Sequence, residues 1–198
     1  MSPSSETVAI VVVTFNRADL LAQMLAGLAR LERRPDAVIV VDNASTDHTR
    51  EVLESATGLE LQAVHLDENT GGAGGFHLGT RMAWERGFDR VWLMDDDVVP
   101  APGCLTVLMD IDEDCLMAVR EDTAGHLVEK AAVDFDLANP LAIKPKRAMV
   151  ESRYASREEM PERVELHNVA FEGFMVRRTV IDAVGLPDPS FFITRTGG

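Results

Sequence analysis

Cysteines, long apolar runs and targeting segments are scarce or missing in this sequence. Cys104 and Cys115 are the only cysteines, and they form neither a CxxC motif nor a cysteine–histidine spacing typical of zinc sites. We therefore expect reduced thiols in a cytoplasmic protein, with no disulfide framework and no zinc site. The first six residues lack the basic region and apolar core of a signal peptide, and the apolar run 8–13 is far too short to cross a bilayer. These absences predict a soluble chain without a transmembrane segment.

Basic side chains are also few. The chain of 198 residues carries 33 acidic against 19 basic side chains, which gives a formal net charge of −14. Because such a surface repels a phosphate backbone, we expect no nucleic-acid partner. An anionic ligand would have to be held locally, by a cation, by backbone N–H groups or by one or two arginines.

The first half of the chain alternates between strand and helix patterns. Apolar runs typical of buried strands lie at 8–13, 36–41, 61–66 and from 90 onward. Helical patterns lie at 18–31, in a short segment capped by Thr46 or Asp47 and ending at 53, and at 76–86. The apolar face of the first consists of Leu20, Leu21, Met24, Leu25, Leu28 and Leu31. The alternation predicts one α/β domain over 1–198, with a doubly wound, mostly parallel sheet flanked by helices.

Beyond Pro100 the pattern is less regular. We predict a helix at 101–110, short strands at 116–119, 126–129 and 168–176, and a helix at 177–184 that ends at Gly185. The stretch 139–162 is rich in charge and proline with little periodicity, which predicts a mobile loop region.

Three adjacent carboxylates, Asp95, Asp96 and Asp97, follow the fourth predicted strand. Ligands of open α/β sheets bind outside the carboxyl ends of the strands, which is where these acids are expected. Carboxylates about 4 Å apart repel by about 1 kcal/mol per pair in water and about 4 kcal/mol at an effective dielectric of 20, so a cation is expected to relieve them. Hard oxygen ligands suit Mg²⁺ or Mn²⁺ shared with substrate phosphates. The alternative is a solvated acidic turn.

Two further features lie at predicted strand ends. The carboxylate of Asp42 could accept the ring N–H of uracil or thymine, or it could form an Asx turn with Ser45, and the two roles are compatible. The glycines of 71–75 could bring backbone N–H groups to a diphosphate, or they could simply form a tight connection. They fail the dinucleotide fingerprint, because His77 stands where its third glycine belongs.

Four motifs in order resemble the family 2 glycosyltransferases. They are Val11-Val12-Val13-Thr14-Phe15-Asn16-Arg17, then Val40-Val41-Asp42-Asn43-x-Ser45-x-Asp47, then Asn69-x-Gly71-Gly72-Ala73-Gly74-Gly75-Phe76, and Trp92-Leu93-Met94-Asp95-Asp96-Asp97. The glycine-phenylalanine form of the third motif is most similar to the rhamnosyl- and galactofuranosyltransferase branch, which acts in cell wall polysaccharide synthesis. The resemblance implies a GT-A fold, a UDP- or dTDP-sugar donor, Mg²⁺ or Mn²⁺, and transfer with inversion to a glycan or lipid-linked acceptor. It also implies a cytoplasmic protein, or a peripheral one at the inner membrane face.

The same resemblance implies roles for individual residues. Thr14, Asn16 and Arg17 would line the base and ribose, and Asp42 would recognise the pyrimidine. Asp95 and Asp97 would lie near the ribose and the metal, supported by Asp96. Asn69, Gly72, Gly74 and Gly75 would shape the sugar-diphosphate pocket. Residues to about 100 would form the nucleotide-sugar half, and those from about 101 an acceptor half.

The end of the chain departs from the family pattern. After a segment like Ser190-Phe191-Phe192-Ile193 the family continues into an acidic pair that includes the general base, whereas this sequence ends with 194–198. We therefore expect an incomplete acceptor half and assign no catalytic base. Two other classes stay open: a non-catalytic nucleotide-sugar binding module or truncated remnant, and a sugar nucleotidyltransferase. The last would need a basic, glycine-rich loop after the first strand, which Thr14 to Arg17 do not form.

Overall fold

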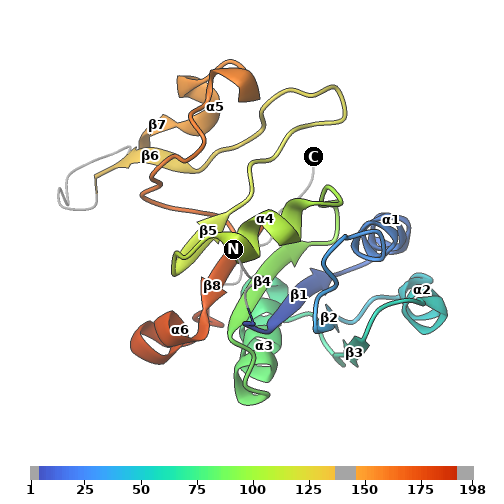
Figure 1. Cartoon of the computed structure of the whole chain (residues 1–198). Helices are drawn as coiled ribbons and strands as arrows, with labels where there is room; N and C mark the ends of the chain where they lie inside the picture. The colour runs from blue at the N-terminus through green and yellow to red at the C-terminus, as the bar shows by residue number, and fades with distance from the viewer. Residues whose placement is uncertain (1–4, 137–145, 191–198) are drawn as a thin grey trace. The chain divides into compact units, whose positions relative to one another are not determined.

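The computed structural model describes residues 5–136 and 146–190 (Figure 1). The chain divides into two compact units, one formed by 1–116 with 172–198 and the other by 117–171. The predicted division into a nucleotide-sugar half and an acceptor half stays a prediction. Among the described residues, no helix has the length and apolar character needed to span a membrane.

A six-stranded sheet forms the centre of the larger unit, in the order β3-β2-β1-β4-β8-β5. Its strands are β1 (Val8–Thr14), β2 (Ala37–Asp42), β3 (Leu61–His65), β4 (Arg90–Asp95), β5 (Cys115–Met117) and β8 (Phe174–Arg177). The first four pair in parallel, and β8 pairs antiparallel with β4. All seven residues of β1 and all six of β2 are buried, as continuous apolar runs predict for strands covered on both faces.

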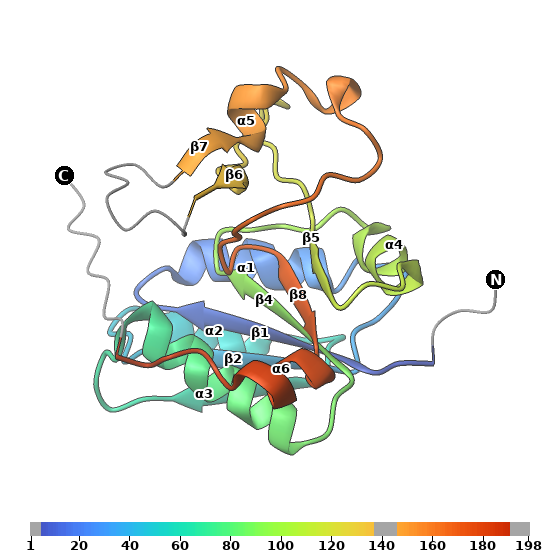
Figure 2. The same ribbon diagram turned by 90° about the vertical axis from the view of Figure 1, so that its left-hand side faces the viewer.

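Helices cover both faces of this sheet. Figure 2 shows α1 (Ala18–Leu28) and α4 (Cys104–Asp110) on one side, with α3 (Gly71–Glu85) and α6 (Arg178–Val184) on the other. The short helix α2 (Thr49–Ser55) packs beside α1. The predicted doubly wound, mostly parallel α/β fold is therefore confirmed.

Helix α3 lies against the sheet because glycines face it. A Cβ atom at Gly75 would lie 2.6 Å from Val13 Cγ1, and one at Gly79 would collide with Val11 Cγ1. At Gly72, in contrast, a Cβ atom would meet nothing within 4 Å. Gly75 and Gly79 thus allow close packing of α3 on β1, while Gly72 does not serve that purpose.

Several predicted boundaries were wrong. Helix α1 ends at Leu28 rather than at 31, and Leu20 is 39% exposed, so it does not belong to the buried face. Helix α3 begins at Gly71 rather than at about 76, so the glycines form its first turns instead of a preceding loop. Gly71 adopts φ +72°, which lets the chain turn directly from its loop into the helix.

The later strands also differ from expectation. Only 174–176 of the predicted strand 168–176 lie in β8 (Phe174–Arg177), and 116–119 contributes to β5 through its first two residues. Helix α6 and its end at Gly185, where φ is +88°, match the prediction. The segment 126–129 is not a strand, since Leu127 forms only an isolated bridge with Glu121.

The smaller unit has its own antiparallel pair and core. Strands β6 (Ala132–Phe135) and β7 (Lys146–Met149) pair, and α5 (Val150–Arg153) and a 3-10 turn (Arg157–Glu159) follow. Ala131, Val133 and Val150 form its buried centre. The predicted loop region 139–162 therefore contains regular structure from 146 onward, and 139–145 lie outside the described residues.

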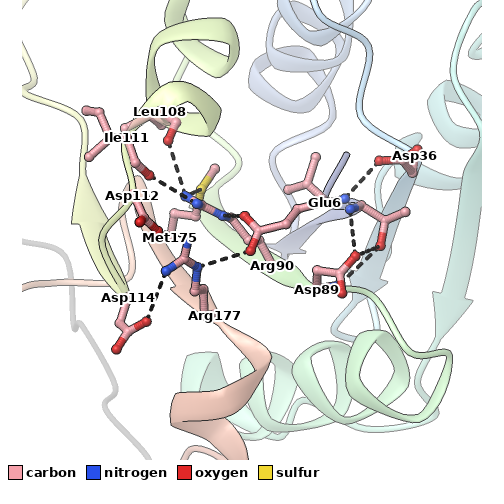
Figure 3. A network of polar contacts seen from close by, with 12 residues as sticks. Glu6, Asp36, Asp89, Arg90, Leu108, Ile111, Asp112, Asp114, Met175 and Arg177 are labelled. Atoms are coloured by element: carbon pink, nitrogen blue, oxygen red, sulfur yellow. Dashed lines mark hydrogen bonds and ion pairs between the residues drawn. The ribbon is translucent and has the colours of Figure 1, made fainter. Parts of the chain in front are cut away.

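A network of ion pairs closes the end of the sheet where β1 and β4 begin (Figure 3). The Arg90 side chain is only 2% exposed, pairs with Glu6 at 2.6 Å and donates to the carbonyl oxygens of Leu108 and Ile111. Arg177 pairs with Asp112 at 2.6 Å and Asp114 at 3.3 Å. Its Nε lies 3.2 Å from Glu6 without hydrogen-bond alignment, so that contact is an ion pair only.

Candidate functional site

The opposite end of the parallel strands gathers most of the predicted polar residues. Thr14, at the end of β1, lies in register with Asp42 at the end of β2, and its neighbour Val13 lies in register with Asp95 at the end of β4. Three adjacent strands thus end in polar side chains at one edge of the sheet. This is the edge at which open α/β sheets bind ligands.

Asp96 is the buried member of the acidic triplet, at 3% exposure. Its Oδ2 accepts the Thr14 hydroxyl at 2.8 Å, and its Oδ1 accepts from Arg17 Nη1 at 3.2 Å. The same Arg17 nitrogen lies 3.0 Å from Oδ2 of Asp97, a side chain that is 46% exposed. Without a ligand, Arg17 therefore supplies the positive charge that the sequence predicts beside these acids.

Burial and pairing act in opposite directions on these charges. Burial raises the pKa of Asp96 above its ordinary value, and the bonds from Thr14 and Arg17 only partly offset this effect. For Arg17, burial would lower the pKa, but Asp96 and Asp97 together raise it. Asp96 is thus held by two donors in a place where its charge is costly, whereas Asp97 keeps access to solvent.

Asp42 is 4% exposed and both of its oxygens accept hydrogen bonds. Oδ1 accepts the N–H of Ser45 at 2.9 Å, which is the predicted Asx turn, and Oδ2 lies 2.8 Å from Nδ1 of His65. Burial alone would raise the pKa of Asp42, but the bonds from Ser45 and His65 lower it. The carboxylate is consequently ionised at neutral pH and fixed at the sheet edge.

Asn16 ties together the loops that follow β1 and β2. Its backbone is left-handed (φ +53°), its N–H donates to the Ser45 hydroxyl at 2.9 Å, and its side-chain oxygen accepts the Thr46 N–H at 2.7 Å. Asp47 extends this tie by accepting the N–H of Ala18 at 3.0 Å and that of Thr49, which begins α2. Hydrogen bonds of Asn16 and Asp47 therefore hold the loop after β1, which contains Arg17, against the loop that follows Asp42.

Asn43 and Asn69 fix the glycine-rich start of α3. The side chain of Asn43 donates to the Gly71 carbonyl oxygen at 2.9 Å and accepts the Thr70 N–H at 2.9 Å, and Asn69 accepts the Gly71 N–H at 2.8 Å. A Cβ atom at Gly74 would lie 2.5 Å from the Thr70 hydroxyl. Of the predicted diphosphate-binding glycines, Gly72 has open space beside it, and Gly74 and Gly75 meet the chain itself.

A preformed metal cage is not present among the described residues, where no cluster of three His, Cys, Asp or Glu side chains is arranged for a metal. The donor set nevertheless suits a hard cation completed by phosphate oxygens, since Asp97 has an accessible carboxylate and Asp95 ends β4 beside it. Arg17 would have to give up its bond to Asp97 for such a cation.

The sequence did not single out His65, and it gave no role to Asn43, although Asn43 stands in the second motif. Both lie at the sheet edge that the strand pattern predicts, His65 as the last residue of β3 and Asn43 directly after β2. Their position at this edge could therefore be predicted from the sequence. Their contacts, of His65 to Asp42 and of Asn43 to the glycine segment, depend on the fold.

Comparison with known proteins identifies the family. The family model described as "Glycosyl transferase family 2" matches residues 9–185. The chain belongs to the family 2 glycosyltransferases. Galactofuranosyltransferase GlfT1 of Mycolicibacterium smegmatis is 34% identical over 194 residues, which cover 96% of this chain and 62% of that protein. GlfT1 of Mycobacterium tuberculosis H37Rv is 34% identical over 195 residues, with 96% and 61% coverage.

Solved structures agree with this glycosyltransferase fold. S. aureus TarS 1-349, crystallised in complex with UDP, superposes with a TM-score of 0.59 at 18% identity, over 89% of this chain and 48% of that one. The likeness supports the GT-A fold. The chain spans about three fifths of the length of the GlfT1 proteins that it matches.

Proposed function

We propose that this chain binds a UDP- or dTDP-sugar and serves in the transfer of its sugar to a glycan or lipid-linked acceptor. The observation that carries the proposal is Asp42, an ionised carboxylate buried at the ligand-binding edge of a family 2 glycosyltransferase. A carboxylate accepts hydrogen bonds but donates none, so it favours a base that presents a ring N–H. Uracil and thymine present one.

Arg17 supplies the second part of the proposal. It neutralises Asp96 and Asp97 in the protein alone, at 3.2 and 3.0 Å, and its side chain is 47% exposed. When a donor arrives with Mg²⁺ or Mn²⁺, Asp97 and Asp95 would hold the cation, and the released guanidinium would be free to pair with a diphosphate oxygen. A bound divalent ion stabilises the charge of a departing diphosphate. Asp96, bonded to Thr14, would remain a support.

The relatives suggest which sugar the donor carries, and transfer with inversion requires a catalytic base. Because two relatives are named galactofuranosyltransferases, a galactofuranosyl donor is the first to test. Transfer with inversion needs in-line attack by an acceptor hydroxyl and a positioned base, which typically contributes about 10² to 10⁴ in rate. No residue of this chain is assigned that role.

Titration calorimetry tests the binding proposal. UDP and dTDP are titrated into the protein with Mn²⁺ and again with EDTA, and pyrophosphate serves as the reference without a base. We expect the nucleotides to bind more tightly than pyrophosphate and to weaken at least tenfold in EDTA. Equal affinity for UDP and pyrophosphate would refute base recognition, and equal affinity in EDTA would remove the metal. A radiolabelled-donor assay then separates a transferase from a binding module.

A further inference from the structure

We propose that His65 is a specificity-determining positioning residue, which fixes the Asp42 carboxylate so that it accepts the ring N–H of uracil or thymine and disfavours cytosine. The inference rests on the proposed function, and it names the base selectivity of the same site. No motif in the sequence draws attention to His65. The structure assigns its role through Asp42.

The two side chains meet because of strand register. Asp42 ends β2, His65 ends β3, and the two residues are paired neighbours in the parallel ladder. Side chains at paired positions lie on the same face of a sheet, so the imidazole and the carboxylate face each other at 2.8 Å. The His65 side chain is 24% exposed and that of Asp42 is 5% exposed. Their contact is therefore largely removed from water.

The contact fixes the tautomer of the histidine. An ionised carboxylate can only accept hydrogen bonds, so Nδ1 of His65 must carry the proton that lies between them. The arrangement places a donor on Oδ2, while the Ser45 N–H places another on Oδ1 at 2.9 Å. Each oxygen of Asp42 thus accepts a hydrogen bond within the protein, and the Ser45 side chain also stabilises its charge.

Partners from two residues orient the carboxylate more firmly than Ser45 alone. The terminal torsion of an aspartate side chain is broad and intrinsically soft, so contacts from Ser45 alone leave the carboxylate more freedom to turn than contacts from Ser45 and His65 together. With His65 on Oδ2 and the Ser45 N–H on Oδ1, a turn of the carboxylate breaks at least one of these bonds. A carboxylate has about four lone-pair positions, so acceptor capacity remains for a ligand, and its direction is set.

A fixed acceptor discriminates between pyrimidines. Uracil and thymine carry a proton on N3 and offer it to the carboxylate. Cytosine presents a lone pair on N3 and offers a proton only from its exocyclic amino group, which lies elsewhere on the ring edge. A carboxylate that can turn could follow that amino group, while one held by Ser45 and His65 could not. His65 therefore narrows the selectivity of Asp42 rather than supplying affinity of its own.

The test is the ratio of CDP to UDP dissociation constants, measured by calorimetry with Mn²⁺. His65→Asn keeps a donor near the position of Nδ1, and His65→Leu removes it. His65→Val is a second variant without a donor, chosen because β-branched residues suit strands. His48→Leu is the matched control, since His48 also pairs with an aspartate, Asp19 at 3.2 Å, but is far more exposed.

We expect the Leu and Val variants to lower the ratio about fivefold or more, and the Asn variant and the control to preserve it. A purely structural histidine would weaken both nucleotides equally or change only the melting temperature, and either result would overturn the inference. An unchanged ratio in His65→Leu and His65→Val would do the same. If the wild-type protein itself fails to prefer UDP over pyrophosphate, the proposed function is refuted and this inference with it. If only the variants behave otherwise than expected, the proposed function stands.

Discussion

The two ends of the central sheet use charge in different ways. At the end closed by Glu6, Arg90 and Arg177, guanidinium donors meet carboxylates and carbonyl oxygens within the chain (Figure 3). At the end that carries Asp42 and Asp97, carboxylates keep acceptor positions that the contacts among residues 5–136 and 146–190 do not fill. The first end joins the strand β4 to segments distant in sequence. We propose that the second end holds its charge for a ligand.

The difference separates residues that stabilise from residues that bind. Arg90 is buried and its bonds leave little for a ligand to add, so its effect should be on stability alone. Asp42 is equally buried, yet it ends β2 at the edge where open α/β sheets bind ligands, and we propose that it keeps acceptor capacity for one. Burial by itself does not distinguish the two roles, and the unused hydrogen-bonding capacity does.

The largest effect is expected at the closed end. Arg90→Met should lower the free energy of unfolding by about 3 kcal/mol, because it leaves the carbonyl oxygens of Leu108 and Ile111 without this donor and removes the 2.6 Å partner of Glu6. Urea unfolding measures the loss, and UDP affinity of the folded fraction should not change. A variant that loses UDP affinity at normal stability would contradict the separation of the two ends.

Asp42→Asn should weaken the preference for uracil over cytosine at the end of the sheet that carries Asp42. The amide can still accept the Ser45 N–H, so the loop should stay folded, but it no longer favours a ring N–H. We expect UDP affinity to fall by about 1.5 to 3 kcal/mol, the cost of a charge-assisted bond, and CDP to lose less. Calorimetry with both nucleotides checks this. Equal losses of affinity for UDP, CDP and pyrophosphate would mean that Asp42 serves only the turn with Ser45 and does not recognise the base.

Asp97→Asn should reduce the metal effect on UDP binding about tenfold while leaving the melting temperature within a few degrees. The side chain is half-exposed, so its charge contributes little to the fold, yet a hard cation depends on that charge. Titrations with Mn²⁺ and with EDTA are compared for the variant and the wild type. Undiminished metal dependence would transfer the ligand role to Asp95.

A pair of glycines separates packing from binding within one helix. Gly79→Ala should destabilise the fold by about 1 to 3 kcal/mol, because its Cβ atom would collide with Val11. Gly72→Ala has open space and should gain about 0.5 to 1 kcal/mol from helix propensity. If Gly72 lines the diphosphate pocket, its variant nevertheless binds UDP more weakly. Unchanged affinity would leave Gly72 without a role in the site.

The smallest effect concerns pH. Burial raises the pKa of Asp96 above 3.8, so the folded state holds its proton more tightly than the unfolded state does. The stability that this group contributes therefore decreases as pH rises from about 3.8 through the raised pKa. The Asp96→Asn variant has no carboxyl group to titrate at this position. The unfolding free energy of the wild type minus that of the variant should therefore fall as pH rises through this range. A rising difference would mean that Thr14 and Arg17 outweigh burial.

The sequence predicts where the strands of this fold lie better than it predicts which strands pair with one another. Runs such as 8–13 and 36–41 are buried on both faces, and their periodicity alone locates β1 and β2. The antiparallel β8 was not foreseen, because no local signal states which neighbour a strand will choose. The start of α3 was missed for a related reason: Asn43 and Asn69 hold glycines in a helix that propensity disfavours.

The candidate site shows the same division. The motifs place Thr14, Asp42 and the triplet 95–97 at strand ends, and the structure brings these ends to one edge. The side-chain pairs of the site could not be predicted from the sequence. Nothing in it indicates that Arg17 joins Asp96 to Asp97, or that His65 lies against Asp42. Likewise Arg90 reads as the first residue of an apolar strand, and only packing reveals its buried network.

The most direct test is a crystal structure of the protein with UDP and Mn²⁺. The account predicts a uracil ring whose N3 lies within hydrogen-bond distance of Asp42, and a diphosphate beside Asp97 with Arg17 turned away from that carboxylate. A nucleotide bound elsewhere on the molecule, or one whose base does not touch Asp42 while Arg17 still bridges Asp96 and Asp97, would contradict it.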